Sequence, residues 1–284
     1  MRLTALTAAT AAIVVSLSAC DDGGKASEQT AVDEIAKLTT VIKEDVAQVR
    51  RGLPQGAAKL GPMLDADTLG NPGALQKAIG RARAEVQDLA ISKGTFFSYA
   101  DATGTVVRSE ADPDMLAGKS IVGTFPALKK ALDPASGVVE TFGQMKELVM
   151  AKTGPDMAWV TAMPVKDDKG GLKGAFLTGW SFRAYVYRLE QSAKMSVTSV
   201  AEKAGKKHAP LVYIYVVKGK TAYGAPGTPD VNAKKAEELD LLGKTSAGPY
   251  RGQAEITGRV FGIAAQRLPE MGDDAVLTVL ASHI

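Results

Sequence analysis

The chain has 284 residues, of which 45% are hydrophobic and 23% are charged, and this composition is typical of a globular protein. It excludes a disordered, collagen-like or multi-span membrane protein. With 34 Lys and Arg against 31 Asp and Glu, the net charge of +3 is too small and too evenly spread to indicate nucleic acid as a partner. The single cysteine and two histidines exclude internal disulfides and a cysteine-rich metal site, so we expect neither a metal nor another cofactor.

The first twenty residues predict the compartment. Met1 and Arg2 give a short positive start, and residues 3–17 are apolar or small. This pattern is typical of a secretory signal peptide, which we assign to residues 1–19. The sequence Leu-Ser-Ala-Cys at 17–20 resembles the lipobox of bacterial lipoproteins, in which the signal is cut before the cysteine and the cysteine is acylated. The alternative is an ordinary signal peptide with an incidental cysteine.

The lipobox resemblance implies a lipid anchor on Cys20, which is the only cysteine of the chain. Acyl chains such as palmitate contribute about 0.8 kcal/mol for each buried CH₂ group, so several chains hold a protein durably on a bilayer. Asp21 directly after the cysteine resembles the signal that keeps some bacterial lipoproteins on the inner membrane. We therefore expect a lipid-anchored protein on the periplasmic face of the cell envelope, with the inner membrane favoured.

The mature chain begins with a polar segment and two predicted helices. Residues 20–30 contain glycine and show no periodicity, which predicts a flexible tether. Apolar residues from Val32 to Leu53 recur at spacings of three and four, which predicts a helix that ends near Gly52, before Pro54. A second helix is predicted to start at Asn71-Pro72. We interpret the two as an antiparallel pair within one monomer, with a dimeric coiled coil as the alternative.

Short strands follow in two series. Each series has a hairpin, a helix and then three strands, and a long helix over 181–203 joins the two. The first series covers 95–108 (hairpin), 124–132 (helix), 138–142, 158–165 and 172–180. The second covers 211–217 and 221–224 (hairpin), 231–242 (helix), 250–256, 259–266 and 275–282. We predict an α+β fold with a helical pair and two antiparallel sheet modules, divided into a first domain at 31–203 and a smaller second domain at 204–284.

The first module carries a family resemblance. Residues 96–112 read FFSYADATGTVVRSEAD and are followed by LAGKS at 116–120, AMPVKD at 162–167 and GAF at 174–176. This pattern resembles the Cache domain, the extracytoplasmic relative of the PAS fold that occurs in bacterial chemoreceptors and sensor kinases. The second module matches by the order of its elements. The resemblance implies PAS-like sheets, a ligand held between a sheet and its covering helices, and action through a membrane partner.

Four residues are candidates for a ligand site in the first module. A guanidinium at Arg108, on the second strand of the hairpin, can hold a carboxylate with two parallel hydrogen bonds. Tyr99, Trp159 and Trp180 are candidates for the aromatic walls of a pocket. The alternatives are a surface position for Arg108 and core or rim positions for the aromatic residues. The run from Trp180 to Tyr185 does not reproduce the cluster of amino-acid-binding Cache domains, so an amino-acid ligand is not supported.

These observations predict a sensory lipoprotein that binds a small, anionic metabolite and acts through a membrane protein. The alternative is a ligand-free scaffold of a cell-envelope complex. We expect no enzyme, because neither His208 nor His283 lies beside a serine nucleophile in a strand-turn-helix setting. A cavity of about 300 Å³ or more lined by Arg108 and aromatic residues would favour binding. A filled core with an exposed apolar patch would favour the scaffold.

Overall fold

The computed structural model describes residues 21–145 and 156–283, so the predicted signal peptide at 1–19 and the lipidation candidate Cys20 lie outside the described residues. The α-helices are α1 (Asp21–Leu60), α2 (Ala66–Leu69), α3 (Pro72–Ala84), α4 (Gln87–Ile91), α5 (Ile121–Thr124), α6 (Phe182–Lys203), α7 (Asp230–Glu238) and α8 (Leu241–Lys244). The 3-10 helices are η1 (Gly61–Met63), η2 (Pro126–Leu132) and η4 (Pro269–Met271). The strands are β1 (Phe96–Asp101), β2 (Val106–Ser109), β3 (Val139–Met145), β4 (Asp156–Lys166), β5 (Leu172–Ser181), β6 (Leu211–Lys218), β7 (Thr221–Gly224), β8 (Tyr250–Ile256), β9 (Arg259–Arg267) and β10 (Ala275–Ser282).

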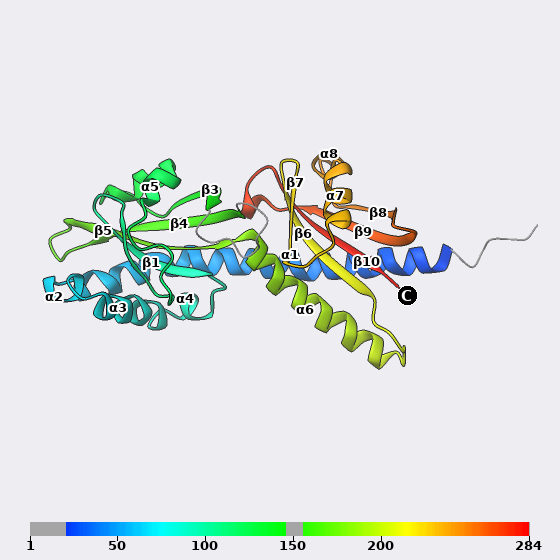
Figure 1. Ribbon diagram of the computed structural model, residues 1–284, viewed down its shortest axis with the longest axis horizontal. Coiled ribbons are helices and arrows are strands. Elements are labelled where there is room, and N and C mark those ends of the chain that lie inside the picture. Colours follow the sequence, from blue (N-terminus) through cyan, green and yellow to red (C-terminus); the bar gives the residue numbers. More distant parts are fainter. Residues whose placement is uncertain (1–20, 146–155, 284) are drawn as a thin grey trace, which may run out of the picture.

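Two antiparallel sheets lie side by side along the molecule (Figure 1). Each has five strands, in the orders β2-β1-β5-β4-β3 and β7-β6-β10-β9-β8, so the strand order of the first sheet is repeated in the second. The strands of the second series form their own sheet, with β6 and β10 paired along their whole length. The prediction of an α+β fold with two PAS-like sheets is confirmed.

Helix α1 connects the two modules. It has 40 residues and is therefore about 60 Å long, and it runs beneath both sheets in Figure 1. Its N-terminal half packs on β9 and β10, and its C-terminal half contacts α3, α4 and the first sheet. The predicted helical pair is found only at this C-terminal end. Helix α1 therefore packs against both of the modules that we predicted as 31–203 and 204–284.

The flexible tether predicted for residues 20–30 is helical from Asp21 onward, so this prediction was wrong. The helix lies on β9 at Gly262, where an added Cβ would come within 2.0 Å of the backbone nitrogen of Glu28. The backbone N–H of His283 also donates to the hydroxyl of Ser27 at 3.0 Å. These contacts come from residues more than two hundred positions away, and the local sequence contains no sign of them.

The predicted end of the first helix near Gly52 was also wrong, because α1 continues through Pro54 to Leu60. Proline removes one backbone hydrogen bond inside a helix, but packing on both sides compensates for the loss. Leu53 and Leu60 are completely buried in the core of the first module. An added Cβ at Gly52 would lie 2.8 Å from the side chain of Leu89, so this glycine allows α4 to approach α1 closely.

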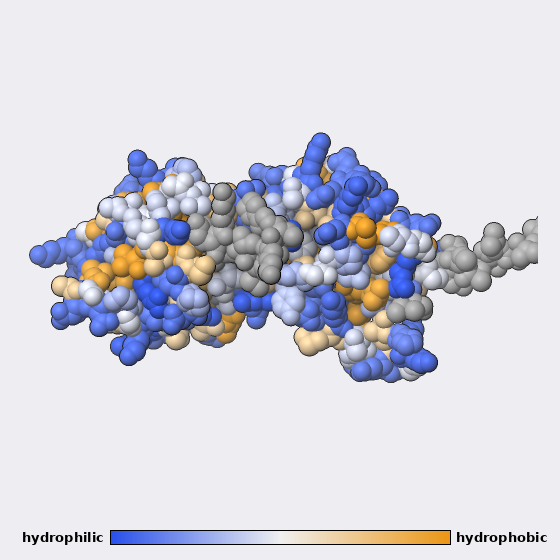
Figure 2. All heavy atoms as spheres, in the orientation of Figure 1, coloured by the Kyte–Doolittle hydropathy of each residue, from blue (hydrophilic) through white to orange (hydrophobic). Residues whose placement is uncertain are grey.

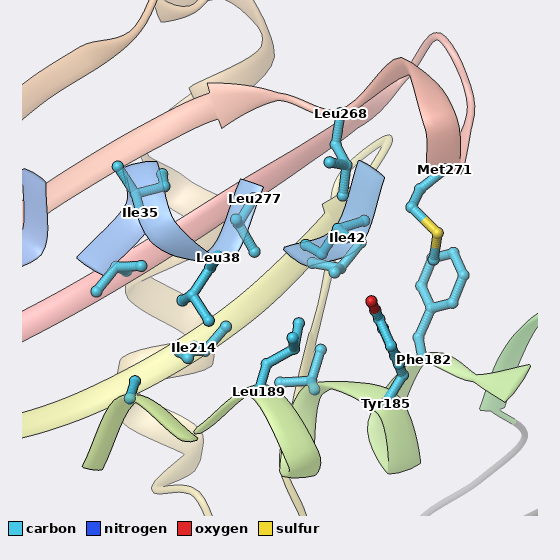
Figure 3. Close-up of a cluster of buried hydrophobic side chains, with 14 of the residues drawn as sticks. Ile35, Leu38, Ile42, Phe182, Tyr185, Leu189, Ile214, Leu268, Met271 and Leu277 are labelled. Carbon is cyan, nitrogen blue, oxygen red and sulfur yellow. The ribbon is translucent and has the colours of Figure 1, made fainter. Parts of the chain in front are cut away.

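The two modules bury their sheets differently. The first sheet has α3, α4 and the end of α1 on one face and α5 with η2 on the other. The second sheet has α7 and α8 on one face. Its other face shares one large core with α1, α6 and the side chains of Trp159 and Trp180 from the first sheet. Figure 3 shows side chains of α6 pointing toward those of α1 within this shared core. The face of the molecule shown in Figure 2 is mostly hydrophilic, with hydrophobic patches over each module.

Helix α6 leaves the end of β5 without an intervening loop. Ser181 is its N-cap, and its hydroxyl accepts a hydrogen bond from the Ala184 N–H at 3.1 Å and donates to Asp156 at 2.6 Å. Asp156 is completely buried, and burial raises its pKa although Ser181 and the helix start partly compensate. The cap fixes the direction in which α6 departs from the first sheet toward β6.

Candidate functional site

Arg108 lies on β2 opposite Tyr99 of β1, but its guanidinium is already paired within the chain. Nη1 is 3.3 Å from Asp114 and Nη2 is 3.7 Å from Asp112. Burial alone would raise the pKa of Asp114, but backbone N–H groups, including those of Ser109 and Leu116, hold that pKa below its ordinary value. Arg108 therefore neutralises a buried, ionised carboxylate and fixes the loop after β2.

The other three candidates lie in packed cores. Tyr99 is buried in the core between the first sheet and its covering helices and donates to the backbone oxygen of Lys173 at 2.6 Å, and burial raises its pKa to about 12. Trp159 and Trp180 are completely buried, with ring centroids 4.3 Å apart. The structure thus pairs Arg108 with Tyr99 and Trp159 with Trp180. None of the four lines the larger cavities of the described residues at α1 and α6, at η2 or beside Arg83.

A cleft does occur close to the tryptophan pair, at the junction of the two modules. The ring of Trp180 stacks on Tyr185 of α6, with centroids 4.6 Å apart and planes inclined by 17°. Tyr185 in turn contributes to a cavity of about 440 Å³ between α1, α6 and the segment that joins α4 to β1. The cavity is lined by Val41, Asp45, Lys93, Tyr185, Arg188, Leu189 and Ser192.

A buried carboxylate lies in the wall of this junction cleft. The side chain of Asp45 accepts a hydrogen bond from the Tyr185 hydroxyl at 2.7 Å, and only 5% of Asp45 is exposed. Burial raises the pKa of Asp45, although the tyrosine, Lys93 and Arg188 counteract part of this effect. Burial and the nearby carboxylate also raise the pKa of Tyr185, so its hydroxyl stays protonated and keeps donating.

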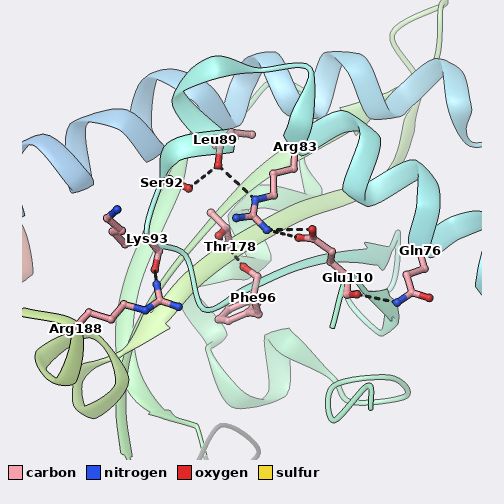
Figure 4. A network of polar contacts seen from close by, with 9 residues as sticks. All are labelled: Gln76, Arg83, Leu89, Ser92, Lys93, Phe96, Glu110, Thr178 and Arg188. Carbon is pink, nitrogen blue, oxygen red and sulfur yellow. Dashed lines mark hydrogen bonds and ion pairs between the residues drawn. The ribbon is translucent and has the colours of Figure 1, made fainter. Parts of the chain in front are cut away.

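Two cations lie at the rim of the junction cleft. Among the described residues, neither Lys93 nor Arg188 has a carboxylate partner within 4 Å. Arg188 instead donates from Nη1 to the backbone oxygen of Lys93 at 2.5 Å, which joins α6 to the first module (Figure 4). The segment that carries Lys93 is fixed in turn by the Ser92 hydroxyl, which donates to the Leu89 carbonyl at 2.9 Å. The cleft therefore offers two positive groups to an anion and one buried acceptor to a hydrogen-bond donor.

Our sequence reasoning missed this cleft. A signal was present, because Asp45 interrupts the apolar stripe of α1 between Ile42 and Val49, where an acid is unexpected. Nothing local indicated that Tyr185 and Lys93 would meet it. Within the described ranges, no group of three or more metal-ligating side chains occurs, and no helix there is long and apolar enough to cross a membrane.

No protein-family model and no curated protein sequence matches the chain. Its fold is similar to that of known sensor domains. The extracellular domain of the putative histidine kinase vpHK1S-Z8 matches over 92% of this chain and 93% of that one, with 12% identity and a TM-score of 0.56. A domain of a putative sensory box/GGDEF family protein from Vibrio parahaemolyticus matches over 92% and 97%, with 11% identity and a TM-score of 0.51.

A methyl-accepting chemotaxis protein X matches over 91% of this chain and 98% of that one, with 14% identity and a TM-score of 0.50. This chain also covers 39% of the length of an extracellular ligand-binding receptor from Desulfohalobium retbaense. The fold is therefore similar to that of PAS/Cache-like sensor domains, with two five-stranded antiparallel sheets. We expected no enzyme, and these similar structures are sensor and receptor domains.

Proposed function

We propose that the protein is an extracytoplasmic sensory lipoprotein that binds a small, anionic metabolite in the junction cleft and passes its bound state to a membrane partner. The observation that carries this proposal is the buried carboxylate of Asp45 close to Lys93 and Arg188, neither of which has a carboxylate within 4 Å among the described residues. A carboxylate with a raised pKa lowers the stability of the fold at neutral pH, and such groups are concentrated at functional sites. The lipid anchor rests on the lipobox resemblance at Cys20.

The position of the junction cleft supports signalling. Asp45 lies on α1, Arg188 on α6 and Lys93 in the first module. A ligand that contacts all three would favour one arrangement of α6 relative to α1. Because α6 continues into β6 and α1 packs on β10, that arrangement would reach the second sheet. The ligand shifts this equilibrium only by the difference in its affinity for the two arrangements.

The metabolite's chemistry follows from the groups that line the junction cleft. Lys93 and Arg188 can bind a carboxylate, and Asp45 can accept a hydrogen bond from a hydroxyl or an ammonium group. We infer a small carboxylate with a donor at its other end. This revises the site that we predicted at Arg108, whose guanidinium is engaged with Asp114.

A thermal-shift screen of carboxylates and amines on residues 21–284 tests the binding proposal. A ligand present at 100 times its Kd should stabilise the protein by about 2.7 kcal/mol. We expect Arg188→Gln or Lys93→Gln to weaken binding of the best compound by about tenfold or more. Lys119→Gln is the matched control, because Lys119 is exposed and lies outside the junction cleft. If the compound binds all three variants equally, it does not bind in the junction cleft.

The ligand-free scaffold is the second candidate function. Two observations favour it: the packed first module, and the exposed side chains of Tyr187 (45%) and Met195 (69%) on α6. If no compound shifts the melting temperature while pull-down of the purified protein with a membrane partner depends on Tyr187 and Met195, the scaffold replaces the sensor.

The lipid anchor needs a separate test. Mass spectrometry of the mature protein should find an acylated N-terminus at Cys20, and Cys20→Ser should release the protein from membranes. An N-terminus elsewhere, or a serine variant that still fractionates with membranes, would refute the anchor and leave the ligand proposal intact.

A further inference from the structure

A second groove lies between the same two helices, away from the junction cleft. The first turns of α1 and the last turns of α6 enclose about 270 Å³. The hydrogen-bonded group formed by Lys37, Glu34 and Ser196 crosses from α1 to α6 next to this groove. We call this space the terminal groove, since it includes His283 near the end of the described chain.

The floor of the terminal groove is apolar. It is formed by Ala26, Val197, Val200, Ala201, Ala204 and Pro210. Figure 1 shows α6 diverging from α1 toward its C-terminal end, and three of the residues that line the groove there are alanines. Val200 remains 60% exposed although it lies in the groove. Apolar surface that stays in contact with water gains free energy when an alkyl chain covers it.

Lys206 offers an ammonium group at the rim of the terminal groove. Lys206 has no carboxylate within 4 Å among the residues that the structure describes. Of the two acids that line the groove, Glu34 forms an ion pair with Lys37 at 2.6 Å, whereas Asp33 accepts a hydrogen bond from the neutral side chain of Gln29 at 2.7 Å. His283 lies 2.9 Å from the Thr30 hydroxyl, and burial with the nearby Lys206 lowers its pKa, so its ring is neutral at pH 7.

We propose that the terminal groove binds a single-chain anionic amphiphile of the fatty-acid class. The alkyl chain covers Val197 and Val200, and the carboxylate pairs with the ammonium of Lys206. The site shares no lining residue with the junction cleft, so it depends neither on the metabolite proposed for that cleft nor on the lipid anchor.

A chain-length series tests the apolar floor. Titration calorimetry of residues 21–284 with hexanoate, octanoate and decanoate, each below its critical micelle concentration, measures the three dissociation constants. Each two-carbon extension should lower Kd by roughly tenfold until the groove is filled. Decylamine should bind at least about tenfold more weakly than decanoate, because Lys206 repels it. A Kd that is independent of chain length, or equal for the amine and the acid, would overturn the proposal.

Two pairs of variants locate the binding. Val200→Asp should weaken decanoate binding by about tenfold or more. Met195 is also exposed on α6 but lies outside the groove, so Met195→Asp should change Kd by less than about twofold. Lys206→Glu should weaken decanoate by about tenfold, and its exposed neighbour Lys207→Glu should not. Circular dichroism checks that each variant is folded.

The same variants separate a soluble amphiphile from a membrane surface. Sedimentation with phosphatidylglycerol vesicles and with phosphatidylcholine vesicles measures attachment to a bilayer. If the protein binds anionic vesicles but no monomeric fatty acid, the terminal groove is a membrane contact and the proposal is wrong. Equal loss of decanoate binding in the Val200 and Met195 variants would also refute it.

Discussion

The two sheets have the same strand order but differ in what covers them. The first sheet is enclosed by helices that lie close to its own strands in the sequence, except for the end of α1. The second sheet depends on α1 and α6 for one whole face, and that face continues into Trp159 and Trp180 of the first sheet. A change at the junction should therefore reach the second sheet, whereas a change in the outer core of the first sheet should remain local.

The largest expected effect comes from breaking the aromatic stack at the junction. Trp180→Ala removes the central ring between Trp159 and Tyr185 and leaves a cavity in the shared core. Replacing a buried tryptophan by alanine costs about 3–5 kcal/mol. We expect a loss of this size in urea unfolding, together with faster amide exchange in β6 and β10.

Phe125→Ala is the matched control for the first sheet. Phe125 is buried between η2 and the outer face of that sheet and does not contact the shared core. Its removal should cost about 3 kcal/mol as well, but the faster amide exchange should be confined to the first module. If both variants raise amide exchange equally in both sheets, the modules unfold as one unit, and the difference that we infer between the two sheets is wrong.

The next effect tests how α1 docks on the second sheet. In Gly262→Ala the new Cβ would collide with the backbone of α1 at Glu28, and overpacking of this kind costs about 1–3 kcal/mol. Amide exchange should rise in the first turns of α1 and in β9. Gly23→Ala on the same helix meets no atom within 4 Å, so we expect it to stabilise the helix by about 0.5 kcal/mol or more.

An unchanged melting temperature in Gly262→Ala would show that the start of α1 is not held on β9. The segment would then behave as the flexible tether that its composition suggests.

The local sequence pattern predicted the structure correctly where the strands are short and are bounded by turn residues. The alternation and the turn residues around Gly104 and Gly258 predicted the strands, and their repeated order predicted two sheets. The same reasoning failed where distant contacts decide the outcome. Pro54 stays helical because Leu53 and Leu60 are buried on either side of it, and the polar start of α1 is helical because Gly262 lets it approach β9.

The candidate site was harder to predict than the fold. A family-like motif placed Arg108 correctly on a strand beside Tyr99. The partner that occupies its guanidinium, Asp114, lies in the loop just downstream, and a sequence does not show which acid folds back. Asp45 and Tyr185 are 140 positions apart, so their hydrogen bond could only be seen in the structure.

A smaller effect is expected at Arg108. Arg108→Ala leaves the buried Asp114 without its cation and should cost about 1–2 kcal/mol, with faster amide exchange in the loop after β2. Arg108→Lys keeps the charge and should lose less. Chemical denaturation of the three proteins measures this order. Equal stability of all three would mean that the ion pair contributes nothing and would free Arg108 for a ligand again.

The smallest effect concerns Asp45, and it depends on pH. Its pKa is raised in the folded protein by burial, above the ordinary value of about 3.9 that we expect in the unfolded chain. Between these two values the folded state binds more protons than the unfolded state. The free energy of unfolding therefore falls as the pH rises through this window, and the loss is complete above the folded pKa.

Asp45→Asn removes this titration and keeps an oxygen that can accept from the Tyr185 hydroxyl. The variant should match the wild type near pH 3 and become the more stable protein as the pH approaches 7. Subtracting the two stability curves isolates Asp45 from Asp156, whose pKa is also raised by burial. A difference that does not change with pH would show that Asp45 is not a strained carboxylate. The reason for assigning the metabolite to the junction cleft would then be lost.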